Sequence, residues 1–182
     1  MSEEIQKIKE EANEIKAKET EVANYELPKL EITDEDKTKF AECLATGKTF
    51  SSRITNPNQN IDVTFRDKTK REGDIVTKQI DALLKTGKIS NAFECSTLYN
   101  LGCLYYQLEE INGVRQERVY PKSAWSLGDF DLFAEVDASP IGAGSSTYTY
   151  ILSGLLSQFN TKLLDLSSRV FDPDFSDPAK DS

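Results

Sequence analysis

Four acidic side chains close together in the sequence offer the clearest opportunity for chemistry. They are Asp129, Asp131, Glu135 and Asp137, and carboxylate oxygens are the ligands that calcium and magnesium prefer. Their spacing is wrong for the calcium loop of an EF-hand, and apolar residues alternate with them, as in a segment that keeps one solvated face. An enzyme that uses carboxylates or a divalent ion, with Asp129, Asp131 and Asp137 as candidates, is therefore an alternative hypothesis and not the preferred one.

The residue types on which most enzymes depend are scarce. The 182 residues include no histidine, which removes the usual general base, the nucleophile pairs that contain histidine and most zinc sites. The segment Gly142–Thr147 lacks the lysine and the third glycine of known phosphate-binding loops. The three cysteines are odd in number and form no CxxC pair, which is typical of reduced thiols in a cytoplasm. We expect no catalytic residue, no metal and no cofactor.

The net charge of −9 argues against nucleic acid and anionic membranes as partners, because both are bound through clustered lysine and arginine. Basic residues concentrate only at 66–71, where acidic neighbours nearly neutralise them. The longest apolar stretch, 150–156, is too short to cross a bilayer, and the first residues are charged rather than typical of an export signal. These patterns predict a soluble protein, made in a cytoplasm, that binds neither nucleic acid nor a membrane.

Residues 1–29 are predicted to form an acidic helical arm and a linker. Apolar residues in the arm recur at alternating spacings of three and four, which is the pattern of a narrow helical seam. The seam residues are Ile5, Ile8, Ala12, Ile15 and Val22, with Glu19 at the one charged position. About three heptads are marginal for a helix on its own. The arm is therefore either a solvated helix or a helix docked on its own domain, on another copy in a homo-oligomer, or on a different protein.

Residues 30–170 are predicted to fold as one α+β domain, followed by an acidic tail at 171–182. We expect one β-hairpin packed on three or four helices. The strands are predicted at 49–55 and 61–66, and the helices at 33–47, 69–87, 91–111 and 147–170. Strict alternation in the hairpin places Asp62, Thr64 and Arg66 toward water, and the helix after Thr69 is expected to lie over the hairpin. The last helix has so broad an apolar stripe that it should be covered on more than one side.

Residues 114–136 show no regular pattern but are rich in aromatic side chains. Long irregular segments with aromatic residues are often contact surfaces, and aromatic anchors dominate the energy of many interfaces. The residues expected to contact a partner protein are Trp125, Phe130 and Phe133 in this segment, and Ile5, Ile8, Ile15 and Val22 in the arm. The preferred hypothesis is a protein that works by burying surface against other proteins.

The segment Ile61–Glu72, with the sequence IDVTFRDKTKRE, places a strand ahead of R-x-x-T-x-x-E and an amphipathic helix. Over about 25 of the 182 residues, this pattern resembles small tail-assembly and baseplate-associated proteins of tailed bacteriophages. The resemblance implies a non-enzymatic role in joining or shielding tail or virion proteins, and it supplies no catalytic residues. The arm, the acidic tail and the aromatic segment lie outside the pattern.

The sequence therefore predicts a structural or assembly protein that binds other protein subunits. The resemblance narrows this to a phage tail or virion accessory protein, or to a tail assembly chaperone. Such a protein is made in the host cytoplasm and is found in the virion if it stays in the assembly. An acidic cytosolic adaptor with no virion role is a further alternative, beside the carboxylate or metal-dependent enzyme.

Overall fold

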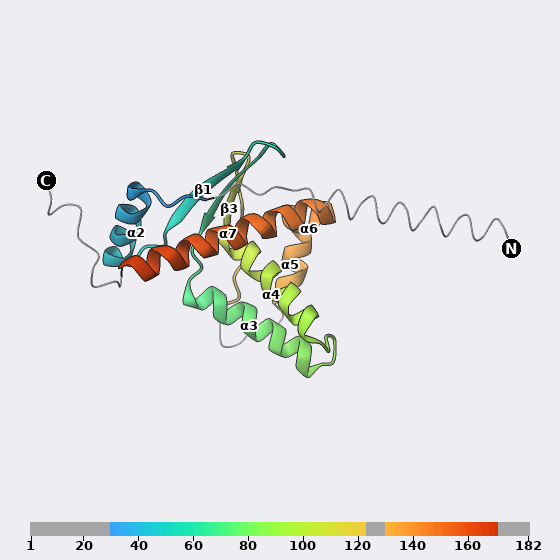
Figure 1. Cartoon of the computed structure of the whole chain (residues 1–182). Helices are drawn as coiled ribbons and strands as arrows, with labels where there is room; N and C mark the ends of the chain where they lie inside the picture. Colours follow the sequence, from blue (N-terminus) through green and yellow to red (C-terminus); the bar gives the residue numbers. More distant parts are fainter. Residues whose placement is uncertain (1–29, 123–129, 171–182) are drawn as a thin grey trace, which may run out of the picture.

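The computed structural model describes residues 30–122 and 130–170, and within them it shows an α+β fold (Figure 1). The helices are α2 (Asp34–Thr46), α3 (Lys70–Lys85), α4 (Ala92–Gln107), α5 (Leu132–Ala138), α6 (Pro140–Ala143) and α7 (Ser146–Val170). The strands are β1 (Ser51–Asn56), β2 (Ile61–Arg66), β3 (Leu108–Ile111) and β4 (Val114–Arg115). The α+β prediction is confirmed, whereas the predicted arm and acidic tail lie outside the described residues. No helix of the described part is apolar over the length that a membrane crossing requires.

Two helices begin at the capping residues that the sequence marks. Thr33 and Asp36 form a reciprocal box at the start of α2, because each side chain accepts a hydrogen bond from the backbone N–H of the other residue. Thr69 and Glu72 form the same arrangement at the start of α3. These bonds satisfy N–H groups that a first helical turn leaves unpaired, so the cap residues fix where each helix starts.

The sheet is an antiparallel meander in the order β1-β2-β3-β4. The predicted hairpin is present as β1 and β2, with Asn56 opposite Ile61 beside the turn. The prediction of a helix that continues to Ile111 is wrong, because α4 ends at Gln107 and the chain goes on as β3. The sheet therefore has two more strands than the sequence predicts.

A tight turn at Asn112 and Gly113 explains the second hairpin. The two residues have φ angles of 48° and 82°. Positive φ at both central residues is what a two-residue hairpin turn needs to match the twist of its strands, and asparagine followed by glycine adopts it at low cost. Pairing with β2 then satisfies the backbone groups of β3 that a longer helix would have bonded internally.

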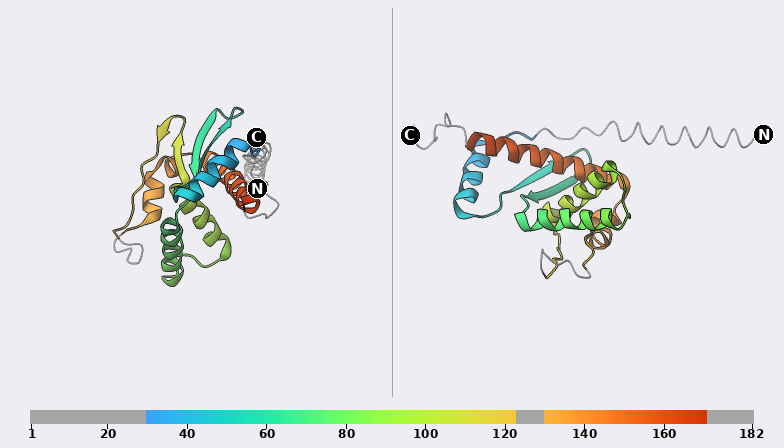
Figure 2. Two further views of the ribbon diagram at one scale, coloured as in Figure 1. Left: turned by 90° about the vertical axis from the view of Figure 1, so that its left-hand side faces the viewer. Right: turned by 90° about the horizontal axis from the view of Figure 1, so that it is seen from below.

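Helix α7 lies across one face of the sheet (Figures 1 and 2). The ring centroid of Phe159 in α7 is 6.3 Å from that of Phe50, just before β1, and 5.8 Å from that of Phe65 in β2. Phe40 of α2 packs edge-on against Phe50 at 5.6 Å. The three elements thus meet around one aromatic cluster, and this cluster lies in the main hydrophobic core.

Helix α4 is central to the core only in its C-terminal half, where residues 102–107 are all buried. Gly102 permits the close approach of α3 and α5, since a Cβ atom there would lie 2.9 Å from Val76 Cγ1 and 3.2 Å from Leu132 Cδ2. Phe93, near the start of α4, lies outside this core, because 80% of the residue is exposed. Helix α3 packs mainly on α4 and not over the hairpin.

Arg66 is an exception to strand alternation. Alternation predicts that it faces water, but the side chain is buried and forms an ion pair with Glu72. The register of β2 against β3 shifts between Thr64 and Phe65, so the end of the strand does not keep a period of two. Tyr120 also donates a hydrogen bond to Glu72, at 2.7 Å. The groups that bury Arg66 come from other elements, which a local pattern does not predict.

Candidate protein-binding site

Two neighbouring helices are almost free of charge. Residues 95–107 of α4 and 146–161 of α7 contain no charged side chain, although 29% of the whole chain is charged. Lys162, the first charged residue in α7, is buried and pairs with Asp36 of α2, with Nζ 2.8 Å from Oδ2. The outer face of a surface helix normally carries charged residues. The surface that α4 and α7 share is therefore unusual for this chain.

The exposed residues of this surface are aromatic, aliphatic, or small and uncharged. Its large exposed apolar residues are Phe93, Tyr99, Tyr150 and Leu164, of which 80%, 38%, 58% and 71% is exposed. Serine, threonine and asparagine side chains lie between them. We call this surface the α4–α7 face and define it by Phe93, Tyr99, Asn100, Leu101, Tyr150, Ser153, Ser157, Asn160 and Leu164.

A groove runs between the two helices on the α4–α7 face. One hollow of about 510 Å³ lies where α4 meets α6 and the start of α7, and Leu101 and Tyr150 line part of it. A second hollow of about 330 Å³ follows α7 toward Leu164. Asn100 and Ser153 line both hollows. The two hollows therefore adjoin and form one groove.

The α7 side of this groove is regular. Five of its lining residues follow one another at spacings of three, four, three and four: Tyr150, Ser153, Ser157, Asn160 and Leu164. Side chains at these spacings form one stripe along a helix, and this stripe is about 21 Å long. The small side chains at its centre leave room for another helix to pack closely.

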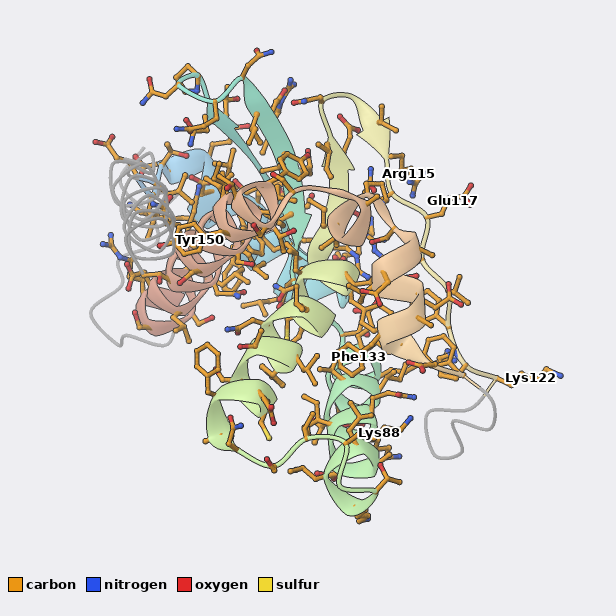
Figure 3. All side chains as sticks on the ribbon, turned by 90° about the vertical axis from the view of Figure 1, so that its right-hand side faces the viewer. Lys88, Arg115, Glu117, Lys122, Phe133 and Tyr150 are labelled. Carbon is orange, nitrogen blue, oxygen red and sulfur yellow. The ribbon has the colours of Figure 1, made fainter. Side chains whose placement is uncertain are left out.

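Asp137 and Lys68 are the two charged residues that line the groove, and other charged side chains lie on another side of the molecule. Figure 3 shows Tyr150 on α7 at one side of the molecule and the charged side chains of Arg115, Glu117 and Lys122 at the other. Protein interfaces are depleted of charge at their centre and enriched in aromatic side chains, and exposed apolar patches on a monomer often mark interaction sites. The α4–α7 face has both properties.

Two of the residues predicted to contact a partner, Phe130 and Phe133, are in the described part of the chain. Both are partly buried against the core, and the backbone carbonyl of Phe130 accepts a hydrogen bond of 2.7 Å from the side chain of Gln79. Their role in an interface stays a prediction. The other predicted contact residues, which are Ile5, Ile8, Ile15, Val22 and Trp125, lie outside the described residues.

One residue of the acidic segment that was considered as a metal site, Asp131, has a structural role. Oδ1 of Asp131 accepts hydrogen bonds from the backbone N–H groups of Phe133 and Ala134, and it thereby caps α5. Asp137 lines the first hollow, and Asp129 lies outside the described residues. Within residues 30–122 and 130–170, no three side chains of the metal-binding types gather closely enough to hold an ion.

Of the three fixed positions of the phage-like pattern, Arg66 and Glu72 form a buried clamp, whereas Thr69 is exposed and caps α3. Arg66 and Glu72 share two hydrogen bonds, one of which joins Nη1 to Oε2 at 3.1 Å. Burial raises the pKa of Glu72, but hydrogen bonds from Arg66, from the backbone of Thr69 and from Tyr120 together outweigh it and hold that pKa below its usual value. In this fold the pattern therefore joins β2, α3 and the segment that contains Tyr120.

Comparisons of the chain with family models, with curated proteins and with solved structures find no match. The sequence signal that identifies the α4–α7 face most directly is the absence of charge from 95–107 and 146–161, which a search for chemical motifs passes over. The breadth of the apolar stripe on the last helix points to the same surface.

Proposed function

We propose that this protein is a non-enzymatic subunit that binds other proteins through the α4–α7 face. The observation that carries the proposal is the groove between α4 and α7, whose lining includes only two charged residues, Asp137 and Lys68, and which is bordered by exposed aromatic and aliphatic side chains. Burial of apolar surface contributes roughly 25 cal/mol per Å². Because only two of the residues that line the groove are charged, a partner that covers it removes water from few charges.

The assembly that we propose is a bacteriophage tail or virion, in which the protein is an accessory subunit or a tail assembly chaperone. Support comes from the resemblance of residues 61–72 to tail-assembly and baseplate-associated proteins. A protein that shields apolar surfaces of other subunits needs an uncharged face of its own, and the α4–α7 face supplies one. An acidic adaptor would use the same face, and it would differ in the identity of its partner.

The shape of the groove suits a helix. An amphipathic helix binds in a groove through apolar residues spaced three or four apart, and the stripe from Tyr150 to Leu164 offers matching positions. Tyr150 and Leu164 are the expected anchors, because large side chains at the contact contribute most of the binding energy. Truncation of such an anchor typically weakens binding by about 2 kcal/mol or more.

The test compares full-length chains that carry two added charges at different places. Tyr150→Glu with Leu164→Glu alters the α4–α7 face, whereas Leu84→Glu with Val114→Glu alters exposed apolar residues on α3 and β4. Each tagged chain is expressed in the cells that produce the natural protein. Co-purifying proteins are then quantified by mass spectrometry, and circular dichroism checks that each chain is folded.

We expect a stoichiometric partner that the control chain retains and that the face variant loses by at least roughly tenfold, which corresponds to about 1.4 kcal/mol. Tail or capsid subunits as partners would support the phage assignment, whereas other host proteins would support the adaptor. The proposal is wrong if both variants retain the same partners, or if the unmodified chain has no stoichiometric partner.

A further inference from the structure

The α4–α7 face has a suitable occupant in the same chain. We propose that the N-terminal arm, residues 1–22, docks in the groove between α4 and α7 of its own chain and has to leave before another protein binds there. This inference rests on the proposed function, since it names what covers the binding face when the partner is absent. The pattern, the length and the attachment point of the arm support it.

The arm and the groove have the same period. Apolar residues from Ile5 to Val22 recur at spacings of three and four, and so do the groove residues of α7 from Tyr150 to Leu164. Two helices whose contact residues share this period pack side by side along their length. The isoleucines of the arm are large enough to fill the space above the serines at the centre of the stripe.

The lengths also agree. A helix from Ile5 to Val22 is about 25 Å long, and the groove stripe from Tyr150 to Leu164 is about 21 Å long. A single helix of this length gains little stability from its own backbone bonds in water and depends on packing of its apolar face. Docking in the groove supplies that packing, and at the same time it covers Tyr150 and Leu164.

The described chain begins beside α7. Leu30 packs against the core, and six residues later Asp36 pairs with Lys162 of α7 at 2.8 Å. Lys162 is two residues from Asn160, so it lies about 200° around the helix and away from the groove stripe. Residues 23–29 reach about 25 Å when extended, whereas a helix is about 10–12 Å wide. The linker is therefore long enough to carry the arm around α7 into the groove.

Docking replaces a surface of low charge with a more highly charged one. Residues 1–29 carry eight glutamates and five lysines, and Glu19 is the only one of them within the apolar seam. With the seam in the groove, the other charged residues of the arm face water. Lys68 lines the same hollow as Leu164 and attracts the acidic arm, whereas Asp137 lines the other hollow and repels it.

Attachment favours the arm of the same chain over the arm of a second copy. A short linker gives a tethered segment an effective concentration in the millimolar range, so the intramolecular contact forms first. The net charge of −9 also makes two copies repel each other. A partner protein therefore competes with the arm, and weakening the arm increases the fraction of chains that are ready to bind.

Photo-crosslinking of the full chain tests this contact. Benzoylphenylalanine is introduced either at Leu164 on the face or at Val114 on β4, residues that are 71% and 64% exposed. Isotope-labelled and unlabelled chains are mixed in equal amounts before irradiation, and crosslinked peptides are identified by mass spectrometry. We expect crosslinks from position 164 to residues 1–22 within single chains, and none from position 114. Crosslinks between a labelled and an unlabelled chain would show docking between two copies and would overturn the proposal. The absence of any crosslink from position 164 to the arm would also overturn it.

Two arm variants provide a matched control. Ile8→Asp with Ile15→Asp adds two negative charges to the seam, whereas Gln6→Asp with Ala17→Asp adds two on the opposite side of the helical pattern. We expect the seam variant to lose the crosslink and to capture several times more partner, and the control variant to behave like the unmodified chain. Equal effects of the two variants would contradict arm docking.

The experiments distinguish a failure of arm docking from a failure of the proposed function. Partner capture that depends on Tyr150 and Leu164 without crosslinks to the arm would leave the binding face in place and show that arm docking is wrong. Crosslinks from position 164 to the arm, combined with partner capture that ignores the face variant, would confirm docking and show that the proposed function is wrong.

Discussion

Arg66 and Glu72 form an ion pair in the interior of the protein, where only 9% and 3% of their side-chain surfaces are exposed. The carboxylate of Glu72 also accepts hydrogen bonds from the backbone N–H of Thr69, at 2.8 Å, and from the hydroxyl of Tyr120, at 2.7 Å. One side chain therefore caps α3, neutralises a residue of β2 and holds the segment that contains Tyr120. Its loss would leave several buried polar groups without a partner, which is costly.

We predict that Glu72→Ala strongly lowers the free energy of unfolding. The change removes the glutamate half of the α3 cap and leaves the buried charge of Arg66 with only its longer ion pair to Glu109, at 3.9 Å, and a loss of about 3–5 kcal/mol is typical when a buried pair is broken. Asp74→Ala is the control, because it breaks a solvent-exposed ion pair with Lys70 on the same helix and should cost less than about 0.5 kcal/mol. Urea unfolding followed by circular dichroism measures both. Similar losses in the two variants would contradict a special role for Glu72.

The same clamp predicts acid sensitivity. Burial raises the pKa of Glu72, but its hydrogen bonds lower it further, so the net pKa lies below the usual value of 4.5. A depressed carboxylate pKa contributes stability that is present above about pH 4.5 and is lost as the pH falls through the lower, folded-state pKa. We therefore expect the stability difference between the unmodified chain and Glu72→Gln to shrink below that pH.

Urea unfolding at several pH values measures this difference. Asp36 has a lowered pKa that does not depend on Glu72, so its contribution cancels in the comparison. Burial raises the pKa of Asp67, and the charge of Glu72 adds to this rise, so Asp67→Asn is introduced into both chains to remove its titration. A difference that stays constant down to about pH 3 would show that Glu72 does not titrate in this way.

Helix starts were predictable from the sequence, because a cap is made by residues three positions apart. The boxes at Thr33 and Thr69 are both present, and the first hairpin lies close to where alternation places it. The end of α4 was not predictable from apolar spacing, since Leu104, Leu108 and Ile111 suit both a helix and a buried strand. In this case the following Asn-Gly turn favours the strand.

The candidate site was predictable only in part. The breadth of the apolar stripe on the last helix predicts that this helix packs against other groups on more than one side. The uncharged stretches of α4 and α7 are also visible in the sequence. That α4 and α7 lie side by side is a tertiary relationship, and no local pattern brings Asn100 next to Ser153. The burial of Arg66 has the same cause, because its partner Tyr120 is 54 residues away.

The β3–β4 turn gives a prediction that separates backbone conformation from side-chain bonding. Gly113 has a φ of 82°, so Gly113→Ala should destabilise the fold by roughly 1–2 kcal/mol through strain. Asn112→Gly keeps a residue that tolerates positive φ but removes the 2.8 Å bond from the backbone N–H of Asp62 to Oδ1 of Asn112, and it should cost about 0.5–1.5 kcal/mol. Thermal and urea unfolding test both. No loss in Gly113→Ala would contradict the turn assignment.

The contact between α3 and α4 gives the last prediction, which contrasts two glycines in neighbouring helices. A Cβ atom at Gly102 would meet Val76 Cγ1 at 2.9 Å and Leu132 Cδ2 at 3.2 Å, whereas the nearest atom to a Cβ at Gly73 is Lys68 Cε at 3.9 Å. We expect Gly102→Ala to lower the free energy of unfolding by about 1–3 kcal/mol through overpacking. Gly73→Ala should raise it by about 0.5–1 kcal/mol, because alanine has the higher helix propensity and the site has room.

A second substitution shows whether steric conflict is the cause of the Gly102→Ala effect. Val76→Ala removes both methyl groups that the new Cβ meets, so the double variant should be less destabilised than the sum of the two single variants. A coupling of about 0.5–3 kcal/mol is usual for residues in direct contact. If the losses in the free energy of unfolding of the two single variants simply add up in the double variant, contact with Val76 is not the reason that position 102 requires glycine. The approach of α3 to α4 would then depend on other contacts.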